Sequence, residues 1–121
     1  MSRLRRRTMS PSCLFCKIVR KEIPATIVAE NEHCVAFRDI NPQAPVHILV
    51  VPKEHVDSLD QARDADVLGR ILLMAGEIAR AENIVETGYR TVLNTNAGAG
   101  QTVFHIHAHV LGGRRMTWPP G

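Results

Sequence analysis

The chain has 121 residues, which is enough for one domain with a hydrophobic core. Hydrophobic residues make up 45% of it, as is usual in soluble globular proteins. No apolar run approaches the ~18 residues of a membrane helix and no cleavable signal is apparent, so we expect a cytoplasmic protein without a membrane partner.

The net charge of +3 is concentrated at the N-terminus, because four of the 15 basic residues are arginines within residues 1–8. The rest of the chain carries 11 basic and 12 acidic residues. A nearly neutral domain lacks the basic surface that nucleic-acid binding needs. We expect a disordered basic tail over residues 1–11, with Met9 as an alternative start, and a folded domain over residues 12–121.

The first half of the chain predicts one short helix and three strands. Residues 12–21 carry apolar side chains at helical spacing, and Pro24 follows them. The first two strands are expected to form a hairpin around Asn31, and a loop rich in Pro and Asn precedes the third. The predicted strands are residues 26–30, 34–38 and 46–52.

The second half predicts the longest helix, over residues 64–82, packed by one face against a sheet. Two further strands are expected over residues 90–95 and over the histidine-rich residues 103–111, with a Gly-rich turn between them. The order helix, three strands, helix, two strands predicts an antiparallel-rich α+β domain. The expected apolar stripe of the long helix is Val67, Leu68, Ile71, Leu72, Ala75, Ile78 and Ala79.

Three histidines, His105, His107 and His109, alternate with apolar residues. This period of two predicts a strand with the three imidazoles on one face. The row spans about 13 Å, which is too long for all three to bind one metal ion. Imidazoles instead suit nucleophilic and acid–base chemistry, and His107 is the best nucleophile because it alone has an imidazole on each side. The side chains expected to pack inward are Phe104, Ile106, Ala108 and Val110.

The Gly-rich turn before these histidines is a candidate phosphate site. Gly98 and Gly100 allow backbone N–H groups to approach an anion, and the hydroxyl of Thr102 can add a bond. A plain loop is the commoner meaning of such a turn, but its position beside the histidines favours phosphate.

Cys13 and Cys16 form a Cys-x-x-Cys pair, which in a cytosolic protein indicates a metal-binding or redox-active site before a structural disulfide. By itself the pair is half of a zinc site, and the alternative is two buried thiols on the first helix. Cys34 is expected in the core.

Residues 105–111 follow the pattern His-apolar-His-apolar-His-apolar-apolar, which resembles the signature of the histidine triad (HIT) superfamily. The ending from Gly112 to Gly121, with its Trp-Pro-Pro-Gly, resembles the Hint branch, the purine nucleoside phosphoramidases. The resemblance covers nearly the whole chain. It implies a HIT-like α+β fold with a five-stranded antiparallel sheet and two helices, and a two-fold homodimer that forms a continuous sheet.

The resemblance also implies hydrolysis of purine nucleoside 5′-phosphoramidates, such as adenosine phosphoramidate or aminoacyl- and lysyl-adenylates. His107 would attack the α-phosphorus, and water would then release an AMP- or GMP-type nucleotide. His109 would bond a phosphate oxygen or protonate the leaving group, while His105 and His47 would orient the nucleophile. Asp39 would bind the ribose hydroxyls. The other implied substrate contacts are Phe15, Ile18, Phe37 and Ile40 at the base, Asn94 beside the nucleotide, and Trp118, which dimers bring toward the partner's site. Gly100, Gln101 and Thr102 belong to the candidate phosphate site described above.

Some HIT relatives complete a Cys-x-x-Cys zinc site with two histidines, at the positions of His55 and His105 here. A zinc ion held by these histidines together with Cys13 and Cys16 would be structural, because no coordination position is left for water. No cofactor is expected for catalysis. Two other functions stay open: hydrolysis of dinucleoside polyphosphates or nucleotidyl transfer within the same superfamily, and nucleotide binding by a non-catalytic interaction dimer.

Overall fold

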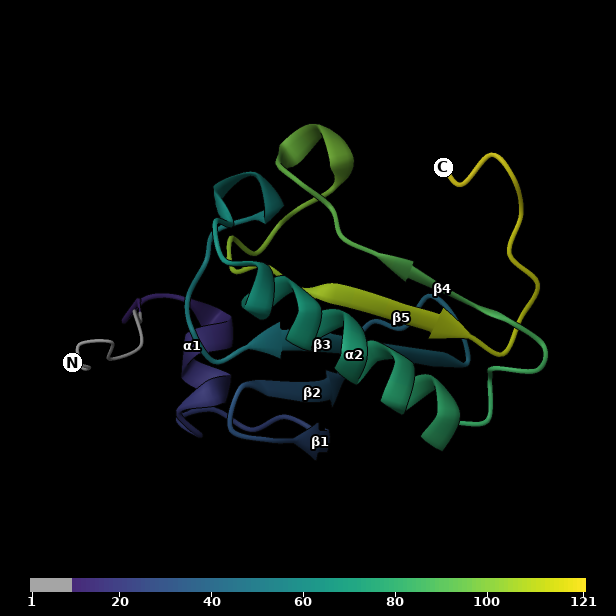
Figure 1. The fold of residues 1–121 in the computed structure, drawn as a ribbon, viewed down its shortest axis with the longest axis horizontal. Helices are drawn as coiled ribbons and strands as arrows, with labels where there is room; N and C mark the ends of the chain where they lie inside the picture. The colour runs from purple at the N-terminus through teal and green to yellow at the C-terminus, as the bar shows by residue number, and fades with distance from the viewer. Residues whose placement is uncertain (1–9) are drawn as a thin grey trace.

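The computed structural model describes residues 10–121, so most of the expected basic tail lies outside the described residues. In order, the elements are α1 (Leu14–Val19), β1 (Ile27–Glu30), β2 (Cys34–Arg38), β3 (Val46–Pro52), the 3₁₀ turn η1 (Leu59–Gln61), α2 (Ala65–Ala81), β4 (Tyr89–Val92), the 3₁₀ turn η2 (Ala97–Ala99) and β5 (Ala108–Gly112). They form the predicted α+β fold, with α2 lying across one face of the five-stranded sheet (Figure 1). No helix within the described part of the chain is both long and apolar enough to cross a membrane.

The strands follow the order β1-β2-β3-β5-β4, and all neighbouring pairs are antiparallel. β1 and β2 are the predicted hairpin, whose turn is fixed where Asn31 Oδ1 accepts a backbone N–H at 2.8 Å from each of two following residues. In the β3–β5 pairing, Leu49 lies opposite His109 and His47 lies opposite Leu111. Diagonal side chains on one face of a strand pair are close neighbours, so this register brings His47 and His109 together.

α2 covers one face of the sheet and has a cap at each end. Asp64 caps its N-terminus by accepting the N–H of Asp66 at 2.9 Å, and Asn83, in a left-handed conformation, follows its C-terminus. Alternate residues of β2, β3 and β5 point toward the helix, as expected for strands with one face toward it. The principal buried members of this core are Cys34, Ala36, Ile48, Val50, Ile71, Met74, Ala75, Ile78, Ala79, Ala108 and Val110.

The apolar stripe of α2 differs from the prediction. Leu72 was placed in the stripe but is 52% exposed, whereas Met74 was left out and is buried. A helix turns once every 3.6 residues, so the face that contains Ile71 continues at positions three and four further on. Position 72 lies about 100° around the helix from that face, which is why its leucine points outward.

α1 covers part of the opposite face of the sheet. The side chain of Cys13 caps its N-terminus, and the helix ends at Val19, well before Pro24, because Lys21 adopts a left-handed conformation with φ 64°. The helix is therefore shorter than the predicted residues 12–21. The core layer on this face consists of Phe15, Ile18, Val35, Phe37, Leu49 and Val51.

The histidine-rich strand is also shorter than predicted. β5 begins at Ala108, and the residues that precede it follow an irregular path. The predicted alternation still holds from Ile106 onward, because Ile106, Ala108 and Val110 all lie in the core beneath α2. Phe104 was expected to pack inward and is 46% exposed. The cause is local, since the N–H of Ile106 donates to the loop carbonyl of Val56 at 2.6 Å and not to a strand neighbour.

Gly112 is the last residue of β5 and lies beneath Ile84, in the connection between α2 and β4. A Cβ atom at this position would lie 2.6 Å from Cδ1 of Ile84. We expect Gly112→Ala to lower the free energy of unfolding by about 1–3 kcal/mol, because the added methyl group overpacks the core. Urea unfolding measures this loss. Gly98→Ala is the matched control, since nothing lies within 4 Å of a Cβ there, and equal losses in the two variants would contradict the prediction.

Candidate active site

A cavity of about 520 Å³ opens on the α1 face of the sheet, and two of the predicted histidines, His107 and His109, line it. Asp39 adds a carboxylate to this wall, and most of the remaining lining residues are apolar. A largely apolar cavity with a few convergent polar groups is the usual form of a small-molecule site.

His107 is oriented by the main chain. Its Nδ1 lies 2.7 Å from the carbonyl oxygen of His105, and because a carbonyl can only accept, Nδ1 carries the proton. The lone pair of the neutral ring is then on Nε2. The ring of Phe15 packs edge-on against His107, with centroids 5.0 Å apart and an interplanar angle of 89°. His107 is therefore a fixed imidazole whose free lone pair is on the atom opposite its anchor.

His109 has the opposite polarity, which a short chain of hydrogen bonds imposes. The backbone N–H of Gln43 donates to His47 Nδ1 at 2.9 Å, so the proton of neutral His47 is on Nε2. That atom lies 2.9 Å from His109 Nδ1 and 3.4 Å from Asp39 Oδ2. His109 therefore accepts at Nδ1 and has its own proton on Nε2. The two ring centroids are 4.9 Å apart. His107 therefore has a lone pair on Nε2 beside a neighbouring ring, His109, that has a proton on its own Nε2.

Asp39, His47 and His109 have the composition of a metal site, and their ligand atoms lie within 4.8 Å of one another. The hydrogen bond from Gln43 argues against a metal ion here. Coordination through His47 Nε2 would move the proton to Nδ1, where it would face the N–H of Gln43. We therefore interpret the three side chains as a hydrogen-bonded relay.

Burial keeps these imidazoles neutral. It is the main cause that lowers the pKa of His109 to about 4, with the neighbouring His107 and His47 adding to the effect. Burial also lowers the pKa of His107 and of His47, and in both cases Asp39 acts in the opposite direction. Near neutral pH the lone pair of His107 is thus available.

The apolar wall of the cavity contains the predicted residues Phe15, Ile18 and Phe37, which are also core residues. Phe15 and Phe37 meet edge to face with centroids 5.4 Å apart. Ile40 is fully exposed at the cavity, and Asp39 Oδ1 accepts the N–H of the residue two positions later at 2.8 Å. Seven further residues line the cavity and were not predicted from the sequence as site residues: Leu14, Ile23, Pro24, Ala25, Arg38, Leu49 and Val103.

The Gly-rich turn differs from the predicted phosphate cradle. The N–H groups of Gly100 and Gln101 donate within the turn, at 3.0 and 3.1 Å. The Gln101 side chain is buried and bonds three main-chain groups, so it holds the loop in place. Thr102 does line the cavity, whereas Asn94 and Trp118 do not, and Trp118 is 82% exposed. Of the phosphate donors expected in this turn, the Thr102 hydroxyl is the one at the cavity.

The structure brings together the four residues of the predicted zinc site. Cys13 Sγ lies 3.4 Å from His105 Nδ1, and Cys16 Sγ lies 3.3 Å from His55 Nδ1 and 3.5 Å from His105 Nδ1. Bonds of about 2.0–2.3 Å to a tetrahedral ion separate neighbouring ligand atoms by roughly 3.3–3.8 Å. The spacing of these donors therefore fits zinc.

The two histidines of this cluster are also in the right tautomer. His105 Nε2 donates to the carbonyl of Pro52 at 2.8 Å, and His55 Nε2 bonds Asp57 Oδ1 at 2.7 Å. Both rings thus direct an Nδ1 lone pair at the sulfur atoms. A carbonyl or carboxylate behind a ligating imidazole is the usual arrangement in metal sites.

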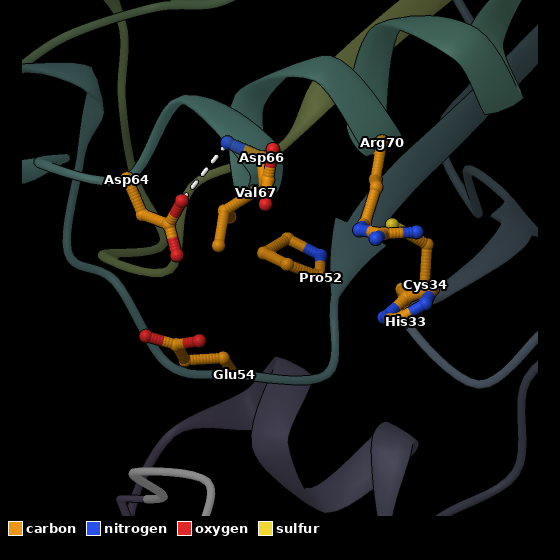
Figure 2. A pocket seen from close by; sticks show the side chains of 8 residues that line it. All are labelled: His33, Cys34, Pro52, Glu54, Asp64, Asp66, Val67 and Arg70. Carbon is orange, nitrogen blue, oxygen red and sulfur yellow. Dashed lines mark hydrogen bonds between the residues drawn. The ribbon is translucent and has the colours of Figure 1, made fainter. Parts of the chain in front are cut away.

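A second hollow, of about 220 Å³, lies beside the start of α2 and contains none of the predicted catalytic residues (Figure 2). The carboxylates of Glu54, Asp64 and Asp66 line one part of it, and Arg70 and His33 line another. Asp64 is occupied as the cap of α2. This hollow lacks the pair of adjacent imidazoles that lines the larger cavity.

Comparisons with known proteins identify the family of the chain. The family model of the HIT domain matches residues 20–116. The chain belongs to the HIT domain family. An uncharacterized HIT-like protein of Synechococcus elongatus is 53% identical over 115 residues, which are 93% of this chain and 100% of that protein. The 14 kDa zinc-binding protein of Zea mays is 50% identical over 122 residues, covering 98% of this chain and 94% of that protein.

The crystal structure of a HIT family hydrolase from Legionella pneumophila has a TM-score of 0.88 and 54% identity to this chain. The match covers 91% of this chain and 100% of that one. The predicted HIT-like fold is therefore confirmed.

The lowered pKa of the half-buried His109 predicts a pH dependence of stability. An unfolded chain protonates this imidazole near its ordinary value of 6.5, but the folded chain does so only near 4. The stability that neutral His109 contributes is therefore present above pH 6.5 and is lost as the pH falls toward 4. His109→Gln, which cannot titrate, should show a shallower loss than the parent protein in urea unfolding across this range.

His33→Gln removes a histidine outside the site and is the matched control. Both variants retain the Cys/His cluster, so acid effects on that cluster cancel in the comparison. If the free energy of unfolding of His109→Gln fell with pH as steeply as that of the parent, the lowered pKa of His109 would be contradicted.

Proposed function

We propose that the chain hydrolyses purine nucleoside 5′-phosphoramidates through a covalent nucleotidyl-histidine intermediate on His107. The observation that carries the proposal is the 2.7 Å contact of His107 Nδ1 with the His105 carbonyl, which leaves the Nε2 lone pair of a neutral imidazole for the substrate. The family membership and the relative named as a HIT family hydrolase support a hydrolase. The Trp-Pro-Pro-Gly ending and the relay around His109 support the phosphoramidate substrate.

In the first step, His107 Nε2 attacks the α-phosphorus and the phosphorus–nitrogen bond to the amine breaks. The ring becomes positively charged, and the His105 carbonyl stabilises it through the proton on Nδ1. The displacement thus becomes two easier steps in place of one hard step. Water then attacks the same phosphorus, the bond from phosphorus to His107 Nε2 breaks, and the water's proton passes to solvent, which releases the nucleotide and leaves His107 neutral.

His109 is suited to the leaving group or to a phosphate oxygen, because its Nε2 carries a proton. His47 holds it in this tautomer through the 2.9 Å bond to Nδ1. A donor aimed at developing negative charge lowers the barrier most when it is already in place. The positioning roles proposed for His47 and His105 follow from these bonds.

The nucleoside is proposed to occupy the apolar part of the cavity, with its base between Phe15, Ile18 and Phe37. Most side chains around this part are apolar and do not distinguish the polar edges of adenine and guanine. This supports an AMP- or GMP-type substrate. Asp39, with one oxygen bonded to a backbone N–H, has lone pairs left for the ribose hydroxyls.

We also propose that Cys13, Cys16, His55 and His105 hold a structural zinc ion. The donor spacing, the histidine tautomers and the zinc-binding relative support it. With four protein ligands the ion has no position for water, so its chemistry is to fix the chain.

A homodimer completes the proposal. β4 is an edge strand with β5 as its single neighbour, so its outer edge is available to a second copy. Large apolar side chains, Leu72, Leu73 and Trp118, are exposed and could be covered by association. Such a dimer would carry Trp118 of one copy toward the cavity of the other.

The reaction is tested with a fluorogenic adenosine phosphoramidate. We expect His107→Ala to lose at least about 10³ in kcat/KM, because the covalent step is removed. Intact-protein mass spectra taken after brief mixing should show one nucleoside monophosphate added to the parent and none added to the variant. His33→Ala should retain full turnover.

Equal turnover by His107→Ala and the parent would contradict the proposal. Binding without any adduct or turnover would favour the non-catalytic dimer, and faster cleavage of a diadenosine polyphosphate would favour the neighbouring activity of the superfamily.

The metal site and the dimer are tested together by native mass spectrometry, with two chains and one zinc ion per chain expected. Cys16→Ser should lose the metal and at least ~3 kcal/mol of stability, because metal binding is coupled to folding. Cys34→Ser, a buried thiol outside the cluster, should retain the metal. A metal-free parent after zinc loading would contradict the site.

A further inference from the structure

The Cys/His cluster and the nucleophile share one residue. The side chain of His105 offers Nδ1 to the two sulfur atoms, while its backbone carbonyl accepts the proton of His107 Nδ1 at 2.7 Å. A main-chain shift at residue 105 therefore disturbs both the cluster and the carbonyl that orients the nucleophile.

A second connection runs through α1. Cys13 precedes the helix and Cys16 lies in its first turn, so both sulfur atoms fasten this short helix to the cluster. Phe15 stands between them and packs on His107 from the other side, at 5.0 Å between centroids. The helix also forms part of the cavity wall through Phe15 and Ile18. The cluster thus fixes both the nucleophile and the wall beside it.

A third connection joins the loop after β3 to the segment that leads into β5. The carbonyls of Pro52, Val56 and Asp57 accept bonds from His105, Ile106 and Gln101 respectively, at 2.8, 2.6 and 2.8 Å. His55 lies within this loop and belongs to the cluster. The two segments that supply Cys13, Cys16 and His55 therefore both contact the catalytic segment, which supplies His105.

The two thiols differ in their access to solvent. Cys13 is half-buried and lines an open hollow of about 430 Å³ together with Ser10, Ser12 and Leu14, whereas Cys16 is fully buried. Each sulfur atom accepts a backbone N–H, at 3.3 Å for Cys13 and 3.4 Å for Cys16, which suits thiolates. A small oxidant can reach Cys13 first, and Cys16 is close enough to resolve the product.

We propose that Cys13 and Cys16 are a hydroperoxide-sensitive site, whose oxidation to an intrachain disulfide releases the metal and disables His107. The proposal rests on the proposed function and on the proposed zinc ion. It assigns to the Cys-x-x-Cys pair a control over turnover in addition to a structural role.

The oxidation balances with a hydroperoxide as the two-electron oxidant. The Cys13 thiolate attacks the outer peroxide oxygen, the O–O bond breaks, and with one proton the products are a sulfenic acid and water or an alcohol. The Cys16 thiolate then attacks the Cys13 sulfur and expels hydroxide, which forms the disulfide. Both sulfur atoms lose their negative charge, so only His55 and His105 would remain as ligands, and two neutral imidazoles would no longer hold a divalent ion.

Cys residues three apart at the start of a helix lie within disulfide reach, since such positions are neighbours on one helical face. After oxidation, the Cys16 sulfur atom no longer carries the negative charge that His105 and His55 both face. Helix α1 is then no longer fixed to the catalytic segment. Displacing a reacting group by about 1 Å can cost on the order of 10²-fold in rate. Turnover is expected to fall by tenfold or more.

The test uses the zinc-loaded full chain, treated with hydrogen peroxide in the presence of a chromogenic zinc indicator. We expect one zinc ion released per chain, a Cys13–Cys16 disulfide in peptide maps made without reductant, and at least a tenfold loss of kcat/KM. Reductant followed by zinc should restore all three readouts. Chelation of the metal without oxidant should lower turnover to a similar extent, and zinc alone should reverse that loss.

Two variants are matched to this test. Cys34→Ser should respond as the parent does, because Cys34 is buried and its thiol pKa is raised by burial to about 11. Cys13→Asp keeps a residue that both caps helices well and binds zinc, but it removes the dithiol. Whatever its starting rate, this variant should lose neither rate nor metal on peroxide treatment.

Retention of zinc by the peroxide-treated parent, or loss of zinc with turnover unchanged, would overturn the proposal. So would an equal loss of rate in Cys13→Asp. If the parent turns over no phosphoramidate at all, the proposed function fails separately. The redox proposal is then tested by metal release, by disulfide mapping and by the affinity for AMP. Oxidation should weaken this affinity.

Discussion

The hydrogen bond between the ring of His107 and the carbonyl of His105 is the constraint on which the site depends. It exists because β5 begins at Ala108, which leaves the preceding carbonyl outside the sheet's ladder. A strand that continued back to residue 103 would tie up this carbonyl with a neighbouring strand. The irregular segment is therefore what allows one histidine to orient the next.

The β3–β5 register supplies the other half of the site. It sets His47 diagonally across from His109, and a main-chain donor at Gln43 fixes which nitrogen of His47 carries the proton. Neighbouring imidazoles repel when charged, and burial adds to that penalty. The fold thus holds three histidines together by keeping them uncharged, and it gives two adjacent rings opposite hydrogen-bonding character.

The sequence predicted the elements better than it predicted the site. Hydrophobic period and turn residues located both helices, the hairpin and the third strand to within a few residues, because side-chain burial controls those features. The pocket residues Phe15, Ile18 and Phe37 followed from the family resemblance. The four-residue Cys/His cluster likewise needed the resemblance, since His55 stands in a loop with no period of its own.

What the sequence could not predict depends on main-chain groups. Every residue except proline has the same backbone N–H and C=O groups. No pattern of side chains therefore predicts that the N–H of Gln43 donates to His47 or that the carbonyl of His105 accepts from His107. The same limit applies at the Gly-rich turn, where the N–H groups of Gly100 and Gln101 donate within the turn. Phe104 was misplaced for a related reason, because a loop carbonyl captured the adjacent N–H.

The anchors of these rings have an evolutionary consequence. The relay begins at the backbone N–H of Gln43, and the rings of His107 and His105 each donate to a backbone carbonyl. Because these groups belong to the main chain, substitutions of the residues that carry them leave the hydrogen-bond partners in place. Sequence drift in the surrounding loops can alter the shape of the pocket without reversing the direction in which protons are held. Homologues with quite different loop residues can therefore inherit the same polarity of the imidazoles, provided that the backbone keeps its course.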